Sequence, residues 1–216
     1  MTPMRLFVLG ATGRTGVELI DLALAHGHTV TAFVRSPSKI TRRDQRLALV
    51  EGSAGEAGPM AAAMRGHDAV VSALGPTPRQ AIAGGTTLMR DSTMTALSAI
   101  QQAGLKRFLV VSSALLFPGG GPAVGFFRWL INHHVRDLRA MEQVLERSAV
   151  EWTIARPPRL VMTRDEAFTA AEGSFPGRLT VGVSMSWRAV AAYLVDALER
   201  RLHTQRVIGL SCARLG

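Results

Sequence analysis

Cysteine, tyrosine and lysine are scarce in this sequence of 216 residues, and each scarcity excludes a class of site. The one cysteine, Cys212, excludes an internal disulfide framework and a cysteine-rich zinc site, so we expect a reducing compartment. The one tyrosine is Tyr193, so chemistry that needs a tyrosine has a single candidate. Lysine occurs only at Lys39 and Lys106, so arginine carries nearly all of the positive charge.

Long hydrophobic runs are absent as well. The apolar run at residues 6–11 is too short for the core of a signal peptide and for a membrane span. Residues 115–131 form a longer apolar and aromatic segment, but its glycines and Arg128 argue against a span. We therefore expect a cytoplasmic protein that has no membrane among its partners.

The overall composition is that of one globular domain. Hydrophobic residues make up 47% of the chain and charged residues 19%, and a chain of this length can bury a large core. The formal net charge of +9 raises the question of nucleic-acid binding. That function also needs an element that reads bases, and the sequence has no zinc-finger, RNP or basic-zipper pattern, so we do not expect it.

Short apolar runs alternate with segments of helical periodicity along most of the chain. Because each connection between strands is a crossover, the pattern predicts a parallel sheet with helices on both faces, which is a doubly wound α/β fold. The predicted strands are residues 4–9, 29–34, 47–50, 69–74, 108–111 and 152–155, and the predicted helices are residues 17–24, 60–64, 94–103 and 135–147.

The chain beyond Pro158 has a looser pattern, with a helix predicted at residues 187–200 and a last strand at residues 206–210. This tail is too small to be an independent domain. We therefore expect residues 1–216 to form a single domain, in which the tail lies over the carboxyl edge of the sheet. Within it, residues 157–185 should contribute a small C-terminal lobe on the substrate side.

Three glycines at intervals of three, Gly10, Gly13 and Gly16, follow the first predicted strand and precede the first predicted helix. Glycine is needed where the chain turns tightly, admits a pyrophosphate against its backbone and packs the helix close to the strand. The helix then presents unpaired N–H groups and its positive dipole end to the phosphates. The pattern predicts a dinucleotide-binding turn, with a glycine-rich turn in a protein that binds no nucleotide as the alternative.

The end of the second predicted strand indicates which dinucleotide is bound. A protein that prefers NAD carries an acidic residue there for the ribose 2′-hydroxyl, whereas the 2′-phosphate of NADP needs arginine. Here the strand is followed by Arg35, Ser36 and Lys39, with no acidic residue at positions 22–43, so the sequence favours NADP(H) over NAD(H). A solvated helix face over residues 35–46 is the alternative explanation, and it accounts for Arg42, Arg43 and Arg46 better than for Arg35.

Three segments together resemble one known group of proteins: Gly-Ala-Thr-Gly-Arg-Thr-Gly at residues 10–16, Phe-Val-Arg-Ser-Pro-Ser-Lys at 33–39 and Trp-Thr-Ile-Ala-Arg-Pro-Pro at 152–158. They are similar to the atypical short-chain dehydrogenase/reductase group of NAD(P)H-binding proteins, and within it to the biliverdin IXβ/flavin reductases and the NmrA-like proteins. The resemblance implies a Rossmann-type sheet and an NADP(H) cofactor. Its motifs specify the cofactor better than the substrate.

The resemblance also implies roles for individual residues. The pyrophosphate would contact Thr12, Gly13, Arg14 and Thr15, beside Gly10 and Gly16, and the adenosine phosphate would contact Arg35, Ser36 and Lys39. Ala73, Leu74 and Gly75 would pass the cofactor's ribose, and Ser112 and Pro157 would lie near the nicotinamide. The substrate would contact Ser113, Phe117, Pro158 and Arg159.

The usual catalytic pair of short-chain dehydrogenases, Tyr-x-x-x-Lys, is missing. Alignment backwards from residues 156–157 through Glu142 places His134 at the tyrosine position and Leu138 at the lysine position. Reduction of an ordinary carbonyl through that pair is therefore not expected. A planar conjugated acceptor, such as a flavin, a quinone or a linear tetrapyrrole, needs little help with protonation and is favoured. Ser112 and His134 are the candidate catalytic residues.

Neither metal binding nor hydrolysis is expected. His133 and His134 are adjacent, so they point to different sides of a helix, and no carboxylate lies at ligand spacing. Ser112 and Ser113 do not lie in a Gly-x-Ser-x-Gly elbow, which excludes the common arrangement of a hydrolase nucleophile.

The role of residues 115–131, the oligomeric state and the function each have more than one interpretation. The segment suits a flap over a flat acceptor, or else a dimer contact or a core edge. The protein is expected to be a monomer or a homodimer that acts on a small molecule. Two other functions fit the missing Tyr/Lys pair or the fold: an NmrA-like redox sensor that binds NADP(H) without turnover, and a reductase or epimerase that acts on a sugar or another small molecule.

Overall fold

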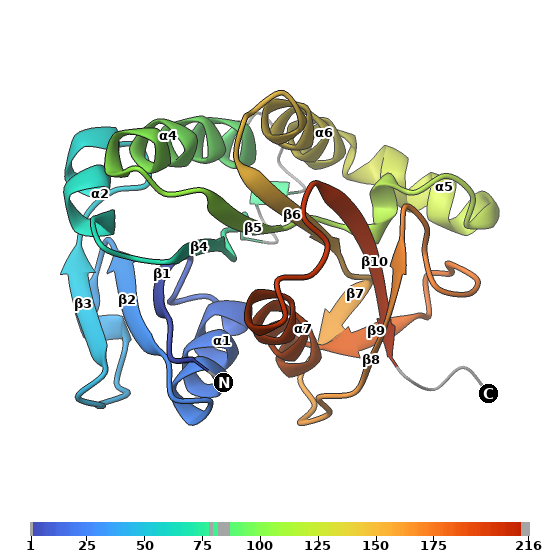
Figure 1. The fold of residues 1–216 in the computed structure, drawn as a ribbon. Helices are drawn as coiled ribbons and strands as arrows, with labels where there is room; N and C mark the ends of the chain where they lie inside the picture. The colour runs from blue at the N-terminus through green and yellow to red at the C-terminus, as the bar shows by residue number, and fades with distance from the viewer. Residues whose placement is uncertain (1, 78–79, 82–86, 213–216) are drawn as a thin grey trace.

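The computed structural model describes residues 2–77, 80–81 and 87–212, which form three layers with one sheet between two groups of helices (Figure 1). The strands of the main sheet are β1 (Arg5–Leu9), β2 (Thr29–Val34), β3 (Leu47–Glu51), β4 (Ala69–Ser72), β5 (Arg107–Val111), β6 (Glu151–Arg156), β8 (Phe168–Glu172) and β10 (Arg206–Cys212). Their order across the sheet is β3-β2-β1-β4-β5-β6-β10-β8. Neighbouring strands are parallel except for β8, which is antiparallel to β10.

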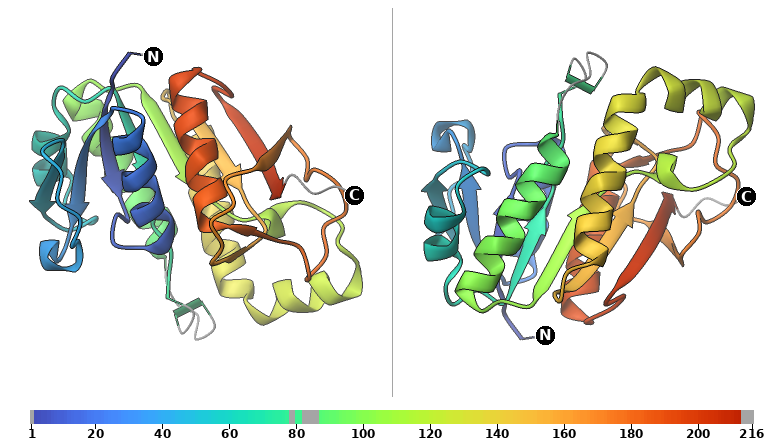
Figure 2. Two further views of the ribbon diagram at one scale, coloured as in Figure 1. Left: turned by 90° about the horizontal axis from the view of Figure 1, so that it is seen from below. Right: turned by 90° about the horizontal axis from the view of Figure 1, so that it is seen from above.

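Helices cover both faces of the sheet (Figure 1 and Figure 2). One face carries α2 (Ala57–Met64), α4 (Leu88–Ala103) and α6 (Asn132–Glu146), and the other carries α1 (Arg14–Ala25) and α7 (Trp187–Glu199). The doubly wound α/β fold predicted from the sequence is thereby confirmed. No helix within the described ranges is long and apolar enough to cross a membrane.

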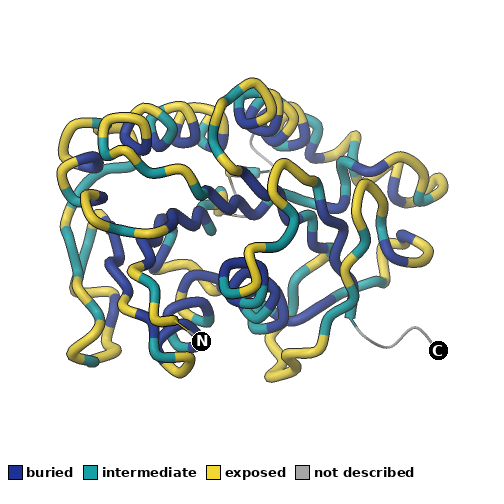
Figure 3. Tube along the Cα trace, in the orientation of Figure 1, coloured by how far each residue is buried: buried dark blue, intermediate teal, exposed yellow. Residues whose placement is uncertain are grey.

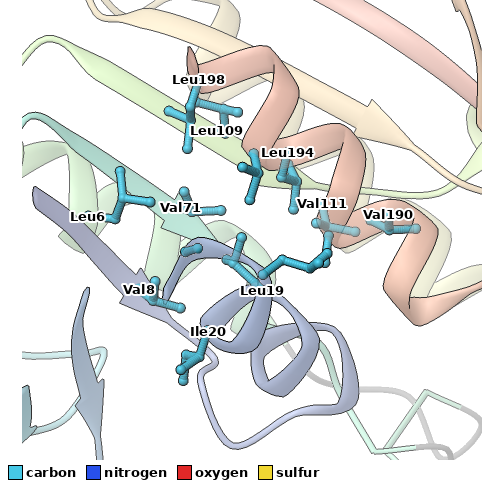
Figure 4. Packing of buried hydrophobic residues seen from close by; sticks show 14 of the residues in the cluster. Leu6, Val8, Leu19, Ile20, Val71, Leu109, Val111, Val190, Leu194 and Leu198 are labelled. Carbon is cyan, nitrogen blue, oxygen red and sulfur yellow. The ribbon is translucent and has the colours of Figure 1, made fainter. Parts of the chain in front are cut away.

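The central strands are buried on both faces, which explains why they are nearly all apolar (Figure 3). Beneath the sheet, Leu19 of α1 and Leu194 of α7 pack with Val8, Val71 and Leu109 in one hydrophobic cluster (Figure 4). Each fully buried side chain of this size contributes about 1.5–3 kcal/mol relative to an exposed one. This cluster fixes the position of α1, and with it the glycine-rich turn that precedes it.

A second cluster lies on the opposite face, where α2, α4 and α6 meet the strands. Successive residues of a strand point to opposite faces, so Phe7 and Phe108 belong to this cluster while Val8 and Leu109 belong to the first. Leu138 of α6, which aligns with the lysine of the usual catalytic pair, is 2% exposed and packs here. It is therefore a core residue of the helix.

The chain after Pro158 divides between two places. Strands β7 (Arg159–Val161) and β9 (Ser184–Ser186) pair in parallel as a separate small sheet, while β8 joins the edge of the main sheet. The expectation that the whole tail lies over the carboxyl edge is corrected, because α7 packs against α1 and β10 lies beside β6. The reason is the apolar face of α7, on which Val190 and Leu194 are fully buried against the sheet.

Residues 115–131 contain a helix, which the sequence analysis did not predict because the segment is rich in glycine. After the short 3-10 turn η2 (Ala114–Leu116), the helix α5 (Gly121–Leu130) begins with Pro122 in its first turn, where the missing N–H of proline is tolerated. Phe126 and Trp129 of α5 are 64% and 70% exposed, and their ring centroids lie 5.8 Å apart. A role of this segment as a flap stays a prediction.

Two local expectations are corrected near the glycine-rich turn. The first helix begins at Arg14 rather than at residue 17, because Gly13 is its N-cap and residues 14–16 already form its first turn. The basic segment after β2 is not a helix face: only Pro37–Lys39 form a 3-10 turn, η1, and residues 40–46 are loop. The helix-face explanation of Arg42, Arg43 and Arg46 is therefore wrong.

Candidate functional site at the carboxyl edge of the sheet

The pairing of β1 and β2 places the glycine-rich turn beside the basic segment. Leu9 of β1 lies opposite Phe33 of β2 in a parallel register. Gly10 and Arg35 therefore follow the ends of adjacent strands at the same edge of the sheet. This is where a dinucleotide fold holds the pyrophosphate and the adenosine ribose.

The other strands end at the same edge. Leu9 pairs with Ser72 of β4 on the other side of β1, so Ala73 lies next to Gly10. Further along the sheet, the backbone N–H of Ser112 donates to the carbonyl of Ala155 at 2.7 Å, which places Pro157 nearby. The chain leaves β1 for β2 on one side and returns to β4 on the other. Ligands of α/β sheets bind at such a switch point, outside the carboxyl ends of the strands.

Backbone packing explains why Gly10 and Gly16 must be glycine. Gly10 has a φ of +75°, and a Cβ atom there would lie 2.6 Å from the backbone of Ala73. A Cβ atom on Gly16 would overlap the carbonyl oxygen of Gly10. At both positions the atoms that a Cβ would meet belong to the backbone, which cannot move aside as a flexible side chain could. The turn is therefore closely packed between β1, β4 and α1.

The first turn of α1 is open to an anion. Gly13 is the N-cap, no side chain caps this end, and the first turn has no acidic residue. The start of a helix leaves N–H groups without partners inside the helix, and its dipole favours negative charge. Thr12 and Arg14 are exposed beside these groups, Thr15 is buried, and the guanidinium of Arg14 lies 5.7 Å from the ring centroid of Trp187. These features fit the pyrophosphate of a dinucleotide.

Arg35 and Lys39 differ from the next basic residue in having no acidic partner. Both are exposed, and neither side chain forms an ion pair or hydrogen bond with a residue in the described ranges. Arg42, by contrast, pairs with Asp21 at 3.4 Å. Two unpaired cations with the half-buried Ser36 between them fit a further phosphate next to the open turn.

The segment after β4 lies against the glycine-rich turn. The backbone N–H of Ala73 donates to the carbonyl of Leu9 at 3.0 Å, and Ala73 and Leu74 are half-buried. Gly75 is exposed. The path agrees with a segment that passes the cofactor, and the contact with its ribose stays a prediction.

Ser112 is held by a buried ion pair that the sequence analysis missed. Its hydroxyl donates to Oε1 of Glu142 at 2.5 Å, and Nε of Arg156 donates to the same oxygen at 3.0 Å. A terminal nitrogen of Arg156 pairs with the other carboxylate oxygen, and the guanidinium lies 4.6 Å from the ring centroid of Phe117. The side chains of Glu142 and Arg156 are 5% and 15% exposed. The hydroxyl hydrogen of Ser112 is therefore committed to Glu142.

An apolar pocket of about 190 Å³ lies beside the ends of β5 and β6. It is smaller than the roughly 300–1,000 Å³ of ligand sites, so it suits part of a flat ring system rather than a nucleotide. The segment after β5, α5, the segment after β6 and the loop at residues 179–183 line it. The lining residues are Ser113, Ala114, Leu115, Val124, Phe127, Pro158, Arg159, Leu179, Thr180, Val181 and Val183.

The structure brings most of the predicted substrate residues into this lining. Ser113, Pro158 and Arg159 all belong to it. Phe117 does not: it is 4% exposed and lies under the guanidinium of Arg156. Phe127 belongs to the segment that was expected to form a flap, and in the structure its side chain lines the pocket.

His134 and Tyr193 lie outside the lining. His134 is in the first turn of α6, its Nδ1 is buried without a partner among the described residues, and burial lowers its pKa below the ordinary 6.5. Tyr193 is fully buried with its hydroxyl 3.1 Å from Nδ1 of His203, and burial raises its pKa far above the usual value. Tyr193 is a core residue, and a catalytic role of His134 stays a prediction. In the described ranges, no three His, Cys, Asp or Glu side chains are grouped to hold a metal ion.

Comparisons with known proteins show the family of the chain. A sequence model of an NAD(P)H-binding family matches residues 10–201. An uncharacterised chloroplastic protein of Arabidopsis thaliana is 29% identical over 163 residues, which cover 71% of this chain and 58% of that protein. The uncharacterised YwnB of Bacillus subtilis is 33% identical over 111 residues, covering 51% and 48%. The chain thus spans about half the length of these relatives.

Two solved structures share the fold along nearly the whole chain. A short-chain dehydrogenase/reductase of Veillonella parvula in complex with NADP superposes with a TM-score of 0.76 at 19% identity, covering 99% of this chain and 96% of that one. The anaerobillin reductase ChuY of Escherichia coli O157:H7 gives 0.75 at 21% identity, covering 98% of both. The two superpositions show a common Rossmann fold, and at identities this low they show the fold alone. The family model, which matches residues 10–201, shows that the chain belongs to the NAD(P)H-binding family, in keeping with the atypical short-chain dehydrogenase/reductase group.

Proposed function

We propose that this protein is a reductase that binds NADPH in preference to NADH and reduces a planar conjugated acceptor such as a flavin or a quinone. The observation that carries the proposal is the apolar pocket, in which the described lining residues include no acidic residue, histidine or tyrosine. Reduction of an isolated carbonyl needs a proton donor at the reacting oxygen. A conjugated acceptor spreads the incoming charge and takes its proton from solvent, so orientation suffices.

The cofactor preference rests on the two unpaired cations after β2. Arg35 and Lys39 would hold the 2′-phosphate through charge-assisted hydrogen bonds, while the N–H groups of residues 14–16 would hold the pyrophosphate. NADH lacks the 2′-phosphate, and the segment offers its ribose hydroxyl no carboxylate. Bound NADPH supplies the hydride.

Ser112 is assigned a positioning role at the nicotinamide end. Because its hydrogen is donated to Glu142, its oxygen is left to accept a hydrogen bond, and the carboxamide N–H of the nicotinamide is a suitable donor. The pocket beside Ser113 would orient the acceptor's ring. One hydride from NADPH and one proton from solvent would together reduce the acceptor by two electrons and leave NADP⁺.

The test is an assay of acceptor-dependent NADPH oxidation, in which the decrease in NADPH absorbance is measured. FMN, riboflavin and menadione should support turnover, whereas a simple aldehyde and a nucleotide sugar should not. Gly16→Val, which would overlap the carbonyl oxygen of Gly10, is the control that should abolish turnover with every acceptor. Tight NADPH binding without turnover of any conjugated acceptor would contradict the proposal.

The exposed aromatic residues of α5 favour a second candidate, an NmrA-like redox sensor. Phe126 and Trp129 form a paired apolar surface outside the pocket, of the kind that partner proteins cover. A sensor would bind NADPH and NADP⁺ with different effects on that partner and would turn over almost nothing. The acceptor assay therefore separates the two candidates.

A further inference from the structure

Among the residues that the structure describes, Arg159 is the one ionisable residue in the lining of the apolar pocket. It is exposed, as are Thr180 and Val181, whereas Ala114 and Leu179 are buried, so these three residues mark the mouth of the pocket. A ring system that enters the pocket must leave its substituents at this mouth. Any charge on those substituents would therefore lie near the guanidinium of Arg159.

The guanidinium of Arg159 has no partner among the described residues, unlike the guanidinium groups of Arg128, Arg156 and Arg188. Arg156 is paired with Glu142, and Arg188 is paired with Glu18 and Glu166. Arg128 donates to the backbone carbonyls at residues 115, 117 and 119. Arg159 forms no ion pair or hydrogen bond with any residue of the described part of the chain.

The segments that line the pocket contain no acidic residue. Residues 113–136, 157–164 and 173–187 supply the pocket and its borders, and none of them contains aspartate or glutamate. Arg159 itself lines the pocket, so the mouth of the pocket presents its positive charge to an incoming molecule.

We infer that the acceptor is a flat ring that carries an anionic group, a phosphate or a carboxylate, and that Arg159 binds this group at the mouth of the pocket. The inference rests on the proposed function, since it names the acceptor class of the same site. An apolar wall selects for the ring, and a single unpaired arginine at its rim selects for charge. A neutral quinone would use only the first of these contacts.

FMN and riboflavin provide a matched pair, because they share the ring and differ by one phosphate. The wild-type protein should have a kcat/KM for FMN about tenfold higher than for riboflavin, and the difference should shrink as salt is added. Arg159→Gln should lower the FMN value to near that of riboflavin, with a much smaller effect on the riboflavin value. Arg65→Gln removes the same charge at the exposed end of α2 and should change neither value.

A binding measurement keeps this inference separate from the proposed function. Quenching of flavin fluorescence by the NADP⁺-loaded protein reports affinity without turnover. Tighter binding of FMN that depends on Arg159 would support the inference even if no flavin is reduced, and would then count against the reductase. The inference would be overturned by equal kcat/KM values for FMN and riboflavin, or by equal losses of kcat/KM for both in Arg159→Gln. It would also be overturned if FMN did not bind at all.

Discussion

Ser112 donates its hydroxyl hydrogen to Oε1 of Glu142 at 2.5 Å, which links the end of β5 to the helix α6 above it. Glu142 also pairs with Arg156 at the end of β6, so one carboxylate joins two neighbouring strands at the carboxyl edge. The candidate catalytic serine is thus positioned by a buried charge pair. Its orientation depends on residues that do not themselves line the pocket.

Removing the carboxylate should destabilise the fold. Glu142→Ala leaves the guanidinium of Arg156 largely buried without its partner, and we expect a loss of about 3 kcal/mol or more in the free energy of unfolding. Urea unfolding measures this loss. Glu146→Ala, on the exposed side of the same helix, is the control and should stay within about 0.5 kcal/mol of wild type. Equal stability of the two variants would show that the ion pair contributes nothing.

The close packing of Gly10 can be separated from its backbone conformation. Gly10 and Gly27 both have positive φ, +75° and +87°, but a Cβ atom would meet the backbone of Ala73 only at Gly10. Gly27→Ala should cost about 1–2 kcal/mol from conformation alone, and Gly10→Ala should cost clearly more. Gly10→Ala should also lose NADPH binding. Denaturant unfolding and NADPH titration of both variants would reveal similar costs if the close approach were unimportant.

Two adjacent phenylalanines of α5 test the pocket. Phe127 lines it, whereas Phe126 is 64% exposed and lies outside the lining. Phe127→Ala should raise the KM for the acceptor about fivefold, since roughly 1 kcal/mol of apolar contact is lost. The KM for NADPH should not change. Phe126→Ala should leave both constants near wild type, and an equal effect of the two variants would remove Phe127 from the acceptor site.

Burial of His134 predicts a stability that falls on acidification. Its pKa in the folded protein lies below 6.5, so between that value and 6.5 the unfolded chain binds a proton that the folded protein does not. The free energy of unfolding should therefore decrease as the pH falls below about 6.5. His67 and His203 have pKa values lowered by burial as well and add to the slope. His134→Gln should flatten the decrease seen in urea midpoints, and an unchanged slope would contradict the assignment.

The glycine-rich turn and the parallel sheet were predictable because local rules determine them. A helix that packs this closely on a strand requires glycine at the positions of Gly10 and Gly16. Apolar runs, in turn, indicate strands that are buried on both faces. The position of Arg35 followed from counting to the end of the second strand. No knowledge of distant contacts was needed for these features.

The apolar pocket and the ion pair beside Ser112 were predictable only in part because they depend on distant contacts. Leu179 and Val183 reach the pocket from a loop without periodicity, so no local pattern marks them. Glu142 gave a weak signal, since it lies on the apolar face of α6 between Leu138 and Leu145. Recognising it as a buried charge required its partner from β6, 14 residues away. The helix α5 was missed because its glycines lower helix propensity, which packing overcomes.

Calorimetric titration with NADPH and NADH tests the central claim most directly. Wild type should bind NADPH more tightly than NADH, and Arg35→Asp should weaken NADPH binding by roughly 2 kcal/mol or more, about 30-fold, through lost charge-assisted bonds and added repulsion. NADH should be much less affected, and Arg65→Asp should change neither affinity. Equal affinities of wild type for the two dinucleotides, or equal losses for both in Arg35→Asp, would contradict the account.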